Sequence, residues 1–179
     1  MEKVTALDGA KIANAVYGFD PQVGEYKIAL DKDKKQIIYN NPDSGLQLAL
    51  YDNSAGSFVI AVRGTDPYGD WGTNIRMFVS THSNMLPNTF IEAQQVITQL
   101  INTEGLNSSN TTIVGHSMGG STAQYLGSTS GFKTLTYNAY GVGNMNAIPG
   151  SSHDNIINYI TMYDFVSTLP GSGDVTPGV

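Results

Sequence analysis

The sequence predicts an α/β fold with a mostly parallel central sheet and helices on both of its faces. Two observations carry this prediction. From Ser57 onward, short apolar or β-branched runs alternate with helical or crossover segments, which is the pattern of a parallel α/β sheet. One of these runs, Thr111 to Val114, is followed at once by GHSMGG and then by a stretch that favours a helix.

Length and composition predict a single domain. The chain has 179 residues, of which 40% are hydrophobic and 13% are charged. That size allows a full hydrophobic core, and the balance is typical of a folded globular protein. We therefore expect one domain over residues 1–179.

Charge and side-chain chemistry exclude several function classes. The net charge of −6 lacks the positive surface that binding to nucleic acid requires. The absence of cysteine excludes disulfides, thiolate catalysis and Cys-type metal sites. Three widely spaced histidines without an H-E-x-x-H pattern predict no zinc site, and no cofactor is expected, although scattered aspartates leave calcium open.

The sequence gives no indication of a membrane span or a signal peptide. The N-terminus MEKVTALDGAK has no apolar core, and the longest purely apolar run is FVIAV at 58–62, far too short to cross a bilayer. We expect a soluble chain without an integral membrane segment. Secretion by a route that needs no signal peptide is compatible with this sequence.

The N-terminal third is expected to hold one helix and a meander of strands. A helix is predicted from Asp8 to Gly18, with Asp8 as its N-cap and Gly18 closing it. The runs QIIY, LQLALYD and SFVIAVR follow, separated by the turn-rich NNPDSG and DNSAG. This order predicts an antiparallel meander that leads into a buried strand.

A long loop and a second helix follow the meander. Residues 63–88 lose all periodicity yet carry several large apolar side chains, which suits a lid or a pocket wall. Thr89 and Glu92 then have the spacing of a capping box, and apolar residues recur at helical spacing before Gly105 ends the helix. Farther on, a helix at 121–127 and strands at 133–137 and 156–163 are predicted.

Ser117 lies at the centre of a G-x-S-x-G motif, between a predicted strand and a predicted helix. The motif alone is weak, since it should occur about 0.2 times by chance in such a chain. Its context is that of a nucleophile elbow, in which side chains at 115 or 119 would collide. The turn would lift the serine Oγ above the sheet, with the Met118 N–H as the first oxyanion donor. A non-catalytic glycine-rich turn is the alternative.

A serine nucleophile needs a histidine base and an orienting carboxylate. Of the acids after Ser117, only Asp164 directly follows a predicted strand, so Asp164 is the predicted carboxylate. No histidine follows Asp164. His116 cannot turn back onto its neighbour and is expected to pack beneath the top of the sheet, whereas His153 is expected in a surface loop.

Three segments together, VIAVRGTDPYGDWGTNI, IVGHSMGG and ITMYDFVSTLP, resemble the class 3 lipases, which include fungal triacylglycerol lipases and bacterial relatives. The resemblance covers nearly the whole chain. It implies an α/β-hydrolase fold with Ser117 as nucleophile and Asp164 as the acid of a catalytic triad. It also implies that Thr65 supplies a second oxyanion donor.

The resemblance implies a serine carboxylic-ester hydrolase, lipase-like or phospholipase-like, acting on lipid acyl esters and touching a membrane or micelle interface only transiently. The family's histidine follows the acid, so we expect a chain that is truncated at its C-terminus, with the histidine beyond Val179. The alternative is a catalytically impaired module that binds lipid or a partner. An acyltransferase would use the same residues.

Overall fold

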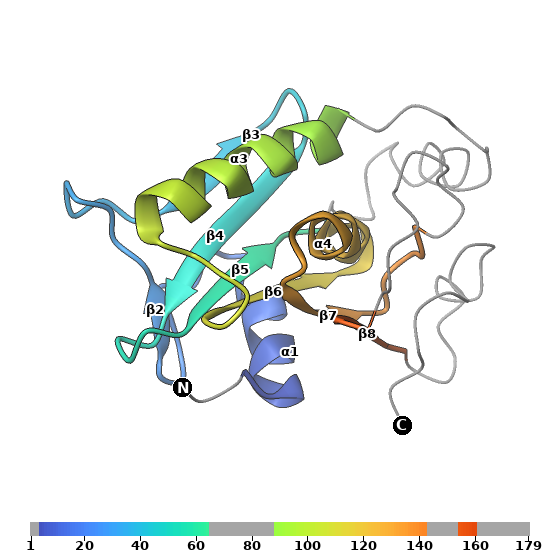
Figure 1. Cartoon of the computed structure of the whole chain (residues 1–179), viewed down its shortest axis with the longest axis horizontal. Coiled ribbons are helices and arrows are strands. Elements are labelled where there is room, and N and C mark those ends of the chain that lie inside the picture. Colours follow the sequence, from blue (N-terminus) through green and yellow to red (C-terminus); the bar gives the residue numbers. More distant parts are fainter. Residues whose placement is uncertain (1–3, 65–87, 143–153, 161–179) are drawn as a thin grey trace.

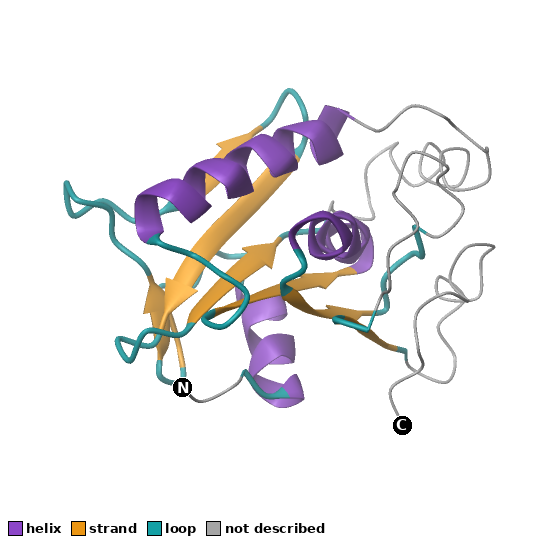
Figure 2. Ribbon diagram, viewed as in Figure 1, coloured by secondary structure: helices purple, strands orange, loops and turns teal. Residues whose placement is uncertain are grey.

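The computed structural model describes residues 4–64, 88–142 and 154–160, which form a mixed sheet with helices on both faces (Figures 1 and 2). The strands are β1 (Gln22–Val23), β2 (Tyr26–Ile28), β3 (Ile38–Asn41), β4 (Leu46–Asp52), β5 (Phe58–Val62), β6 (Thr111–His116), β7 (Lys133–Tyr137) and β8 (Ile156–Tyr159). Their order across the sheet is β1-β2-β4-β5-β6-β7-β8, and β3 also pairs with β4.

The N-terminal half of the sheet is antiparallel, which confirms the predicted meander. Strand β3 pairs with the first part of β4, with Tyr39 opposite Leu48, and β4 pairs with β5, with Leu48 opposite Val62. Strands β1 and β2 extend this half beyond β4. They have only two and three residues, which is too short for an alternating pattern to predict them.

The second half of the sheet is parallel, which confirms the alternation predicted from Ser57 onward. Strand β6 lies between β5 and β7, and its Gly115 is opposite Val62 on one side and Thr136 on the other. Strand β8 continues the parallel order beyond β7. The sheet as a whole is mixed, because the meander adds an antiparallel half. The carboxyl ends of β5 to β8 meet along one edge.

The three described helices cover both faces of the sheet, as predicted. They are α1 (Ala6–Ala15), α3 (Asn88–Glu104) and α4 (Ser117–Ser130). Helix α1 packs on one face with a core that includes Ile12, Val59 and Val114. Helices α3 and α4 pack on the other face (Figure 1). Each face therefore buries its own apolar cluster.

The predicted start and end of the first helix are wrong. Helix α1 begins at Ala6, and Thr5 is its N-cap, because the Thr5 hydroxyl accepts a hydrogen bond of 3.1 Å from the Asp8 N–H. Asp8 lies inside the first turn, where its carboxylate accepts from Thr5 at 2.5 Å. After the helix, Phe19 and not Gly18 adopts a positive φ, of 50°.

The second predicted helix exists, but its capping box does not form. Helix α3 begins at Asn88, so Thr89 lies within the first turn and not at the N-cap position. The Thr89 hydroxyl donates to the Ser44 carbonyl at 2.8 Å. The predicted end at Gly105 is confirmed, since Gly105 has a φ of +68°.

Glu92 binds the neighbouring strand instead of capping its own helix. Its Oε1 accepts hydrogen bonds from the Tyr39 hydroxyl at 2.5 Å and the Asn41 amide at 2.6 Å. Burial alone would raise the pKa of the Glu92 carboxyl, but hydrogen bonds from Ser44, Tyr39 and Asn41 outweigh it and lower that pKa. Glu92 therefore joins the start of α3 to β3.

Candidate functional site

The candidate site is the turn that joins β6 to α4, which we call the Ser117 turn (residues 115–119). His116 ends the strand in an extended conformation, and Ser117 begins the helix with a φ of +54°. A positive φ is uncommon for a residue with a side chain and stores strain when the surroundings enforce it. Ser117 is partly exposed.

The two glycines of the motif are required by space. A Cβ on Gly115 would lie 2.5 Å from the Gly119 carbonyl oxygen. A Cβ on Gly119 would overlap the Val62 carbonyl oxygen and lie 2.6 Å from the Gly64 nitrogen. Neither neighbour can yield, because both are backbone atoms. The prediction that side chains at 115 and 119 collide is therefore confirmed.

The same contacts bring the end of β5 against the Ser117 turn. Gly64 follows β5, and its nitrogen and the Arg63 carbonyl carbon both face the space above Gly119. The chain that leads to Thr65 therefore passes directly beside the first turn of α4. Thr65 itself, a predicted oxyanion donor, lies outside the described residues.

Met118 occupies the first turn of α4, next to Ser117. The first N–H groups of a helix have no hydrogen-bond partner within the helix, and the helix dipole places partial positive charge at this end. The N-terminus of α4 lies at the carboxyl edge of the parallel strands, beside the end of β5. That location is favourable for binding an oxyanion.

The polar residue Asn158 fixes the segment that follows β7 beside the Ser117 turn. Its side chain is fully buried and accepts hydrogen bonds from the Thr136 hydroxyl at 2.9 Å and the Ala139 N–H at 3.3 Å. It also donates to the Ala139 carbonyl at 3.2 Å. Ala139 packs closely on Gly120, since a Cβ added to Gly120 would lie 2.5 Å from the Cβ of Ala139.

The predicted acid Asp164 lies outside the described residues, as do His82 and His153, two of the three histidines of the chain. Asp154 is described, and it precedes β8 by two residues, at the edge of the sheet opposite the Ser117 turn. Asp154 is therefore excluded as a partner of Ser117.

His116 does not face Ser117. Its Nδ1 lies 2.9 Å from the hydroxyl of Tyr17, a residue that packs with the α1 side of the sheet. This agrees with the expectation that His116 packs beneath the top of the sheet. The sequence reasoning missed Tyr17, because its contact with His116 spans 99 positions.

Residues 8–169 match the family of Tle-like phospholipase domains, described as phospholipase-like. The chain belongs to this family. The match spans the β6–α4 region, so the Ser117 turn lies inside the matched part of the chain.

The fold of this phospholipase-like domain is that of a lipase. Its structure is similar to the crystal structure of a triacylglycerol lipase from Penicillium expansum, with a TM-score of 0.52 and 11% sequence identity. The similarity covers 89% of this chain and 71% of the lipase chain. The predicted α/β-hydrolase-like fold and the lipase resemblance are thereby confirmed. No curated protein matches the chain.

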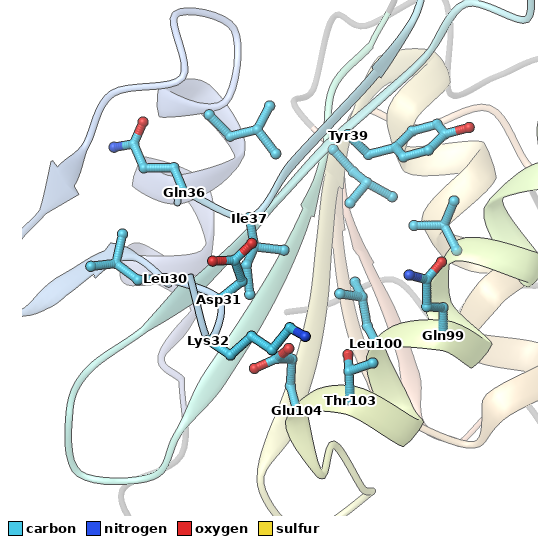
Figure 3. Close-up of a pocket in the computed structure, with 13 residues that line it drawn as sticks. Leu30, Asp31, Lys32, Gln36, Ile37, Tyr39, Gln99, Leu100, Thr103 and Glu104 are labelled. Carbon is cyan, nitrogen blue, oxygen red and sulfur yellow. The ribbon is translucent and has the colours of Figure 1, made fainter. Parts of the chain in front are cut away.

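A pocket in the phospholipase-like domain lies away from the Ser117 turn. It has a volume of about 820 Å³ and opens between the C-terminal half of α3 and strand β3 (Figure 3). Its lining is partly apolar, with Ile37 and Leu100, and carries both signs of charge on Lys32 and Glu104. None of its lining residues belongs to β5, β6 or α4.

The described part of the domain contains neither a membrane-spanning helix nor a cluster of metal ligands. Among residues 4–64, 88–142 and 154–160, no helix is both long and apolar enough to cross a membrane. Within the same ranges, His, Asp and Glu side chains form no group of three that could hold a metal ion. The Ser117 turn is therefore the candidate site that the described residues support best.

Proposed function

We propose that the protein is a serine carboxylic-ester hydrolase that cleaves acyl esters of phospholipids and related lipids, with Ser117 as its nucleophile. The observation that carries this proposal is the conformation of Ser117. A serine with a φ of +54° begins a helix directly after a parallel strand, in a member of a phospholipase-like family. A strained serine between a strand and a helix supports the assignment of a nucleophile elbow.

In the proposed reaction, the Ser117 Oγ attacks the acyl carbonyl carbon and loses its proton to a histidine. The carbonyl oxygen becomes an oxyanion, which the N–H groups of Met118 and Thr65 stabilise. Collapse of the tetrahedral intermediate releases the alcohol or lysolipid, which takes the proton from the histidine. Water then attacks the acyl-enzyme by the same route and releases the fatty acid.

Asp164 is assigned the task of orienting that histidine and stabilising its charged form. His116 is excluded as the base, because it contacts Tyr17 on the α1 side of the sheet. The base in this proposal is a histidine, and the resemblance to class 3 lipases implies one that comes after the acid in the chain.

The protein, expressed from its complete natural reading frame, is assayed on phosphatidylcholine vesicles, triacylglycerol emulsions and p-nitrophenyl butyrate. We expect fatty-acid release from vesicles, and a loss of at least about 10³-fold in Ser117→Ala. Ser130→Ala is the matched control, because Ser130 lies in the same helix and bonds only to backbone groups in the described structure.

Three results would contradict the proposal. Equal rates for Ser117→Ala and the unmodified protein would exclude Ser117 as the nucleophile. Vesicle binding without ester cleavage by the unmodified protein would identify a lipid-binding module instead. Transfer of the acyl group to an added alcohol in preference to water would identify an acyltransferase.

A further inference from the structure

Tyr17 connects the α1 side of the sheet to the residue that precedes Ser117. It follows α1 by two positions and packs against the apolar cluster on that face. Its hydroxyl oxygen lies 2.9 Å from His116 Nδ1, and the two rings meet edge to face with their centroids 5.9 Å apart. Tyr17 therefore holds the side chain at the end of β6.

The same hydroxyl also touches the end of β5. A Cβ on Gly64 would overlap the Tyr17 hydroxyl and lie 2.8 Å from the His116 carbonyl oxygen. The φ of Gly64 is not in the left-handed region, so glycine is needed here for space and not for conformation. The ends of β5 and β6 and the Tyr17 hydroxyl therefore meet in one close contact.

Arg63 holds the ring of Tyr17 from the β5 side. The guanidinium carbon lies 5.6 Å from the centre of the Tyr17 ring, within the range of a cation–π interaction. Its Nη1 donates to the Gln47 side chain, and its backbone N–H donates to the Gln47 carbonyl at 2.9 Å. Arg63 is thus fixed to β4 while it covers Tyr17.

We propose that Tyr17 is a positioning residue that locks the Ser117 turn to the end of β5. The inference rests on the proposed function, in which one oxyanion donor follows Gly64 and the other follows Ser117. Such donors act only when they are held within a fraction of an ångström of the developing charge. Tyr17 contacts Gly64 and His116, so it fixes the end of β5 relative to the Ser117 turn and acts through these two segments, not on the substrate itself.

A simpler role for Tyr17 would be to attach α1 to the sheet. Tyr137 provides the control, because its hydroxyl donates to the Ala6 carbonyl at 2.6 Å and attaches the other end of α1. Among the described residues, its hydroxyl makes no hydrogen bond to the Ser117 turn or to Gly64. If attachment of α1 were all that mattered, Tyr17→Phe and Tyr137→Phe would have equal effects on catalysis.

The kinetic test compares these two variants in the complete natural protein on p-nitrophenyl butyrate. Tyr17→Phe is expected to lower kcat by about 10- to 100-fold, as expected for a small displacement of catalytic groups. KM should stay within about twofold. Tyr137→Phe should leave kcat within about twofold, although both variants lower the unfolding midpoint.

The role of His116 is tested in the same assay. His116→Leu should lose as much kcat as Tyr17→Phe, and the double variant should lose no more than either single one. His116→Gln should recover part of the rate, because its amide group can restore a hydrogen bond to Tyr17.

Hydrogen exchange gives a readout that does not depend on activity. Tyr17→Phe should speed amide exchange in residues 114–120 by at least about tenfold, whereas Tyr137→Phe should leave this segment unchanged. If Tyr17→Phe keeps the original kcat and exchange rates, or if both variants behave alike, the inference is wrong.

The two proposals fail in different ways. If the unmodified protein cleaves no ester, or if Ser117→Ala is as active as the unmodified protein, the proposed function is wrong. The exchange rates then still decide whether Tyr17 holds the Ser117 turn. If Ser117→Ala is inactive and Tyr17→Phe is fully active, only the inference about Tyr17 is overturned.

Discussion

Replacing Ser117 by glycine should stabilise the protein while it abolishes the proposed catalysis. A left-handed conformation costs an L-residue about 1–2 kcal/mol, and the φ of Ser117 is +54°. Glycine avoids that cost but loses about 0.5–1 kcal/mol through its greater freedom in the unfolded chain. The difference leaves a net gain of about 0.5–1 kcal/mol.

The gain should appear in thermal unfolding followed by circular dichroism. For a domain of this size, 1 kcal/mol shifts the midpoint by about 2–4 °C, so Ser117→Gly should unfold about 1–4 °C above Ser117→Ala. The comparison with alanine isolates the Cβ, because both variants lack the hydroxyl. A glycine variant that is equal to or less stable than the alanine variant would refute the strain at Ser117.

Ser54 supplies the matched control for this measurement. It has nearly the same φ, 57°, but lies in the exposed turn between β4 and β5. The unfolding midpoint of Ser54→Gly should exceed that of Ser54→Ala by a similar margin, and neither substitution should affect ester cleavage. If the margin appears at Ser54 and not at Ser117, the backbone of the Ser117 turn is not strained.

Two further predictions concern packing and pH. Gly119→Ala should lower the free energy of unfolding in urea by about 1–3 kcal/mol or more, because its Cβ would meet the backbone of β5. Gly131→Ala is the control: its Cβ would have open space, and the φ of +72° should cost only about 1 kcal/mol. Equal losses in the two variants would contradict the overlap at Gly119. Burial, aided by the charge of Asp20, raises the pKa of Tyr51 to about 12. The neutral phenol is thus favoured in the folded state, and its contribution to stability is complete below pH 10 and lost as pH rises to about 12. In Tyr51→Phe, the free energy of unfolding should fall less steeply between pH 10 and about 12 than in the unmodified protein. An unchanged slope would contradict the raised pKa of Tyr51.

The order of strands and helices could be predicted because hydrophobic periodicity is a local signal. Strand β4 alternates its leucines, and α3 repeats apolar residues at helical spacing, so both were placed within a few residues. The caps could not be predicted with equal success. Thr5 and Asp8 are both good capping residues, and the sequence does not say which of the two begins the helix.

Many contacts that hold the fold and the candidate site together are long-range, which is why the sequence did not predict them. Glu92 has the spacing of a capping residue, yet its partners Tyr39 and Asn41 come from a strand about fifty residues earlier. Tyr17 has no motif around it. The glycine in RGTD was the one available signal, since a glycine directly after a buried strand predicts that another chain segment approaches closely.

The positions of glycine and serine in the Ser117 turn argue against a turn that serves structure alone. Gly115 and Gly119 do not have positive φ values, and glycine is required there because backbone atoms occupy the space of a Cβ. Position 117 is the one place in the turn where the backbone is left-handed and glycine would be cheapest. A purely structural turn would be expected to carry glycine there. Serine in its place retains a side chain at a cost in stability, which supports a requirement for its hydroxyl.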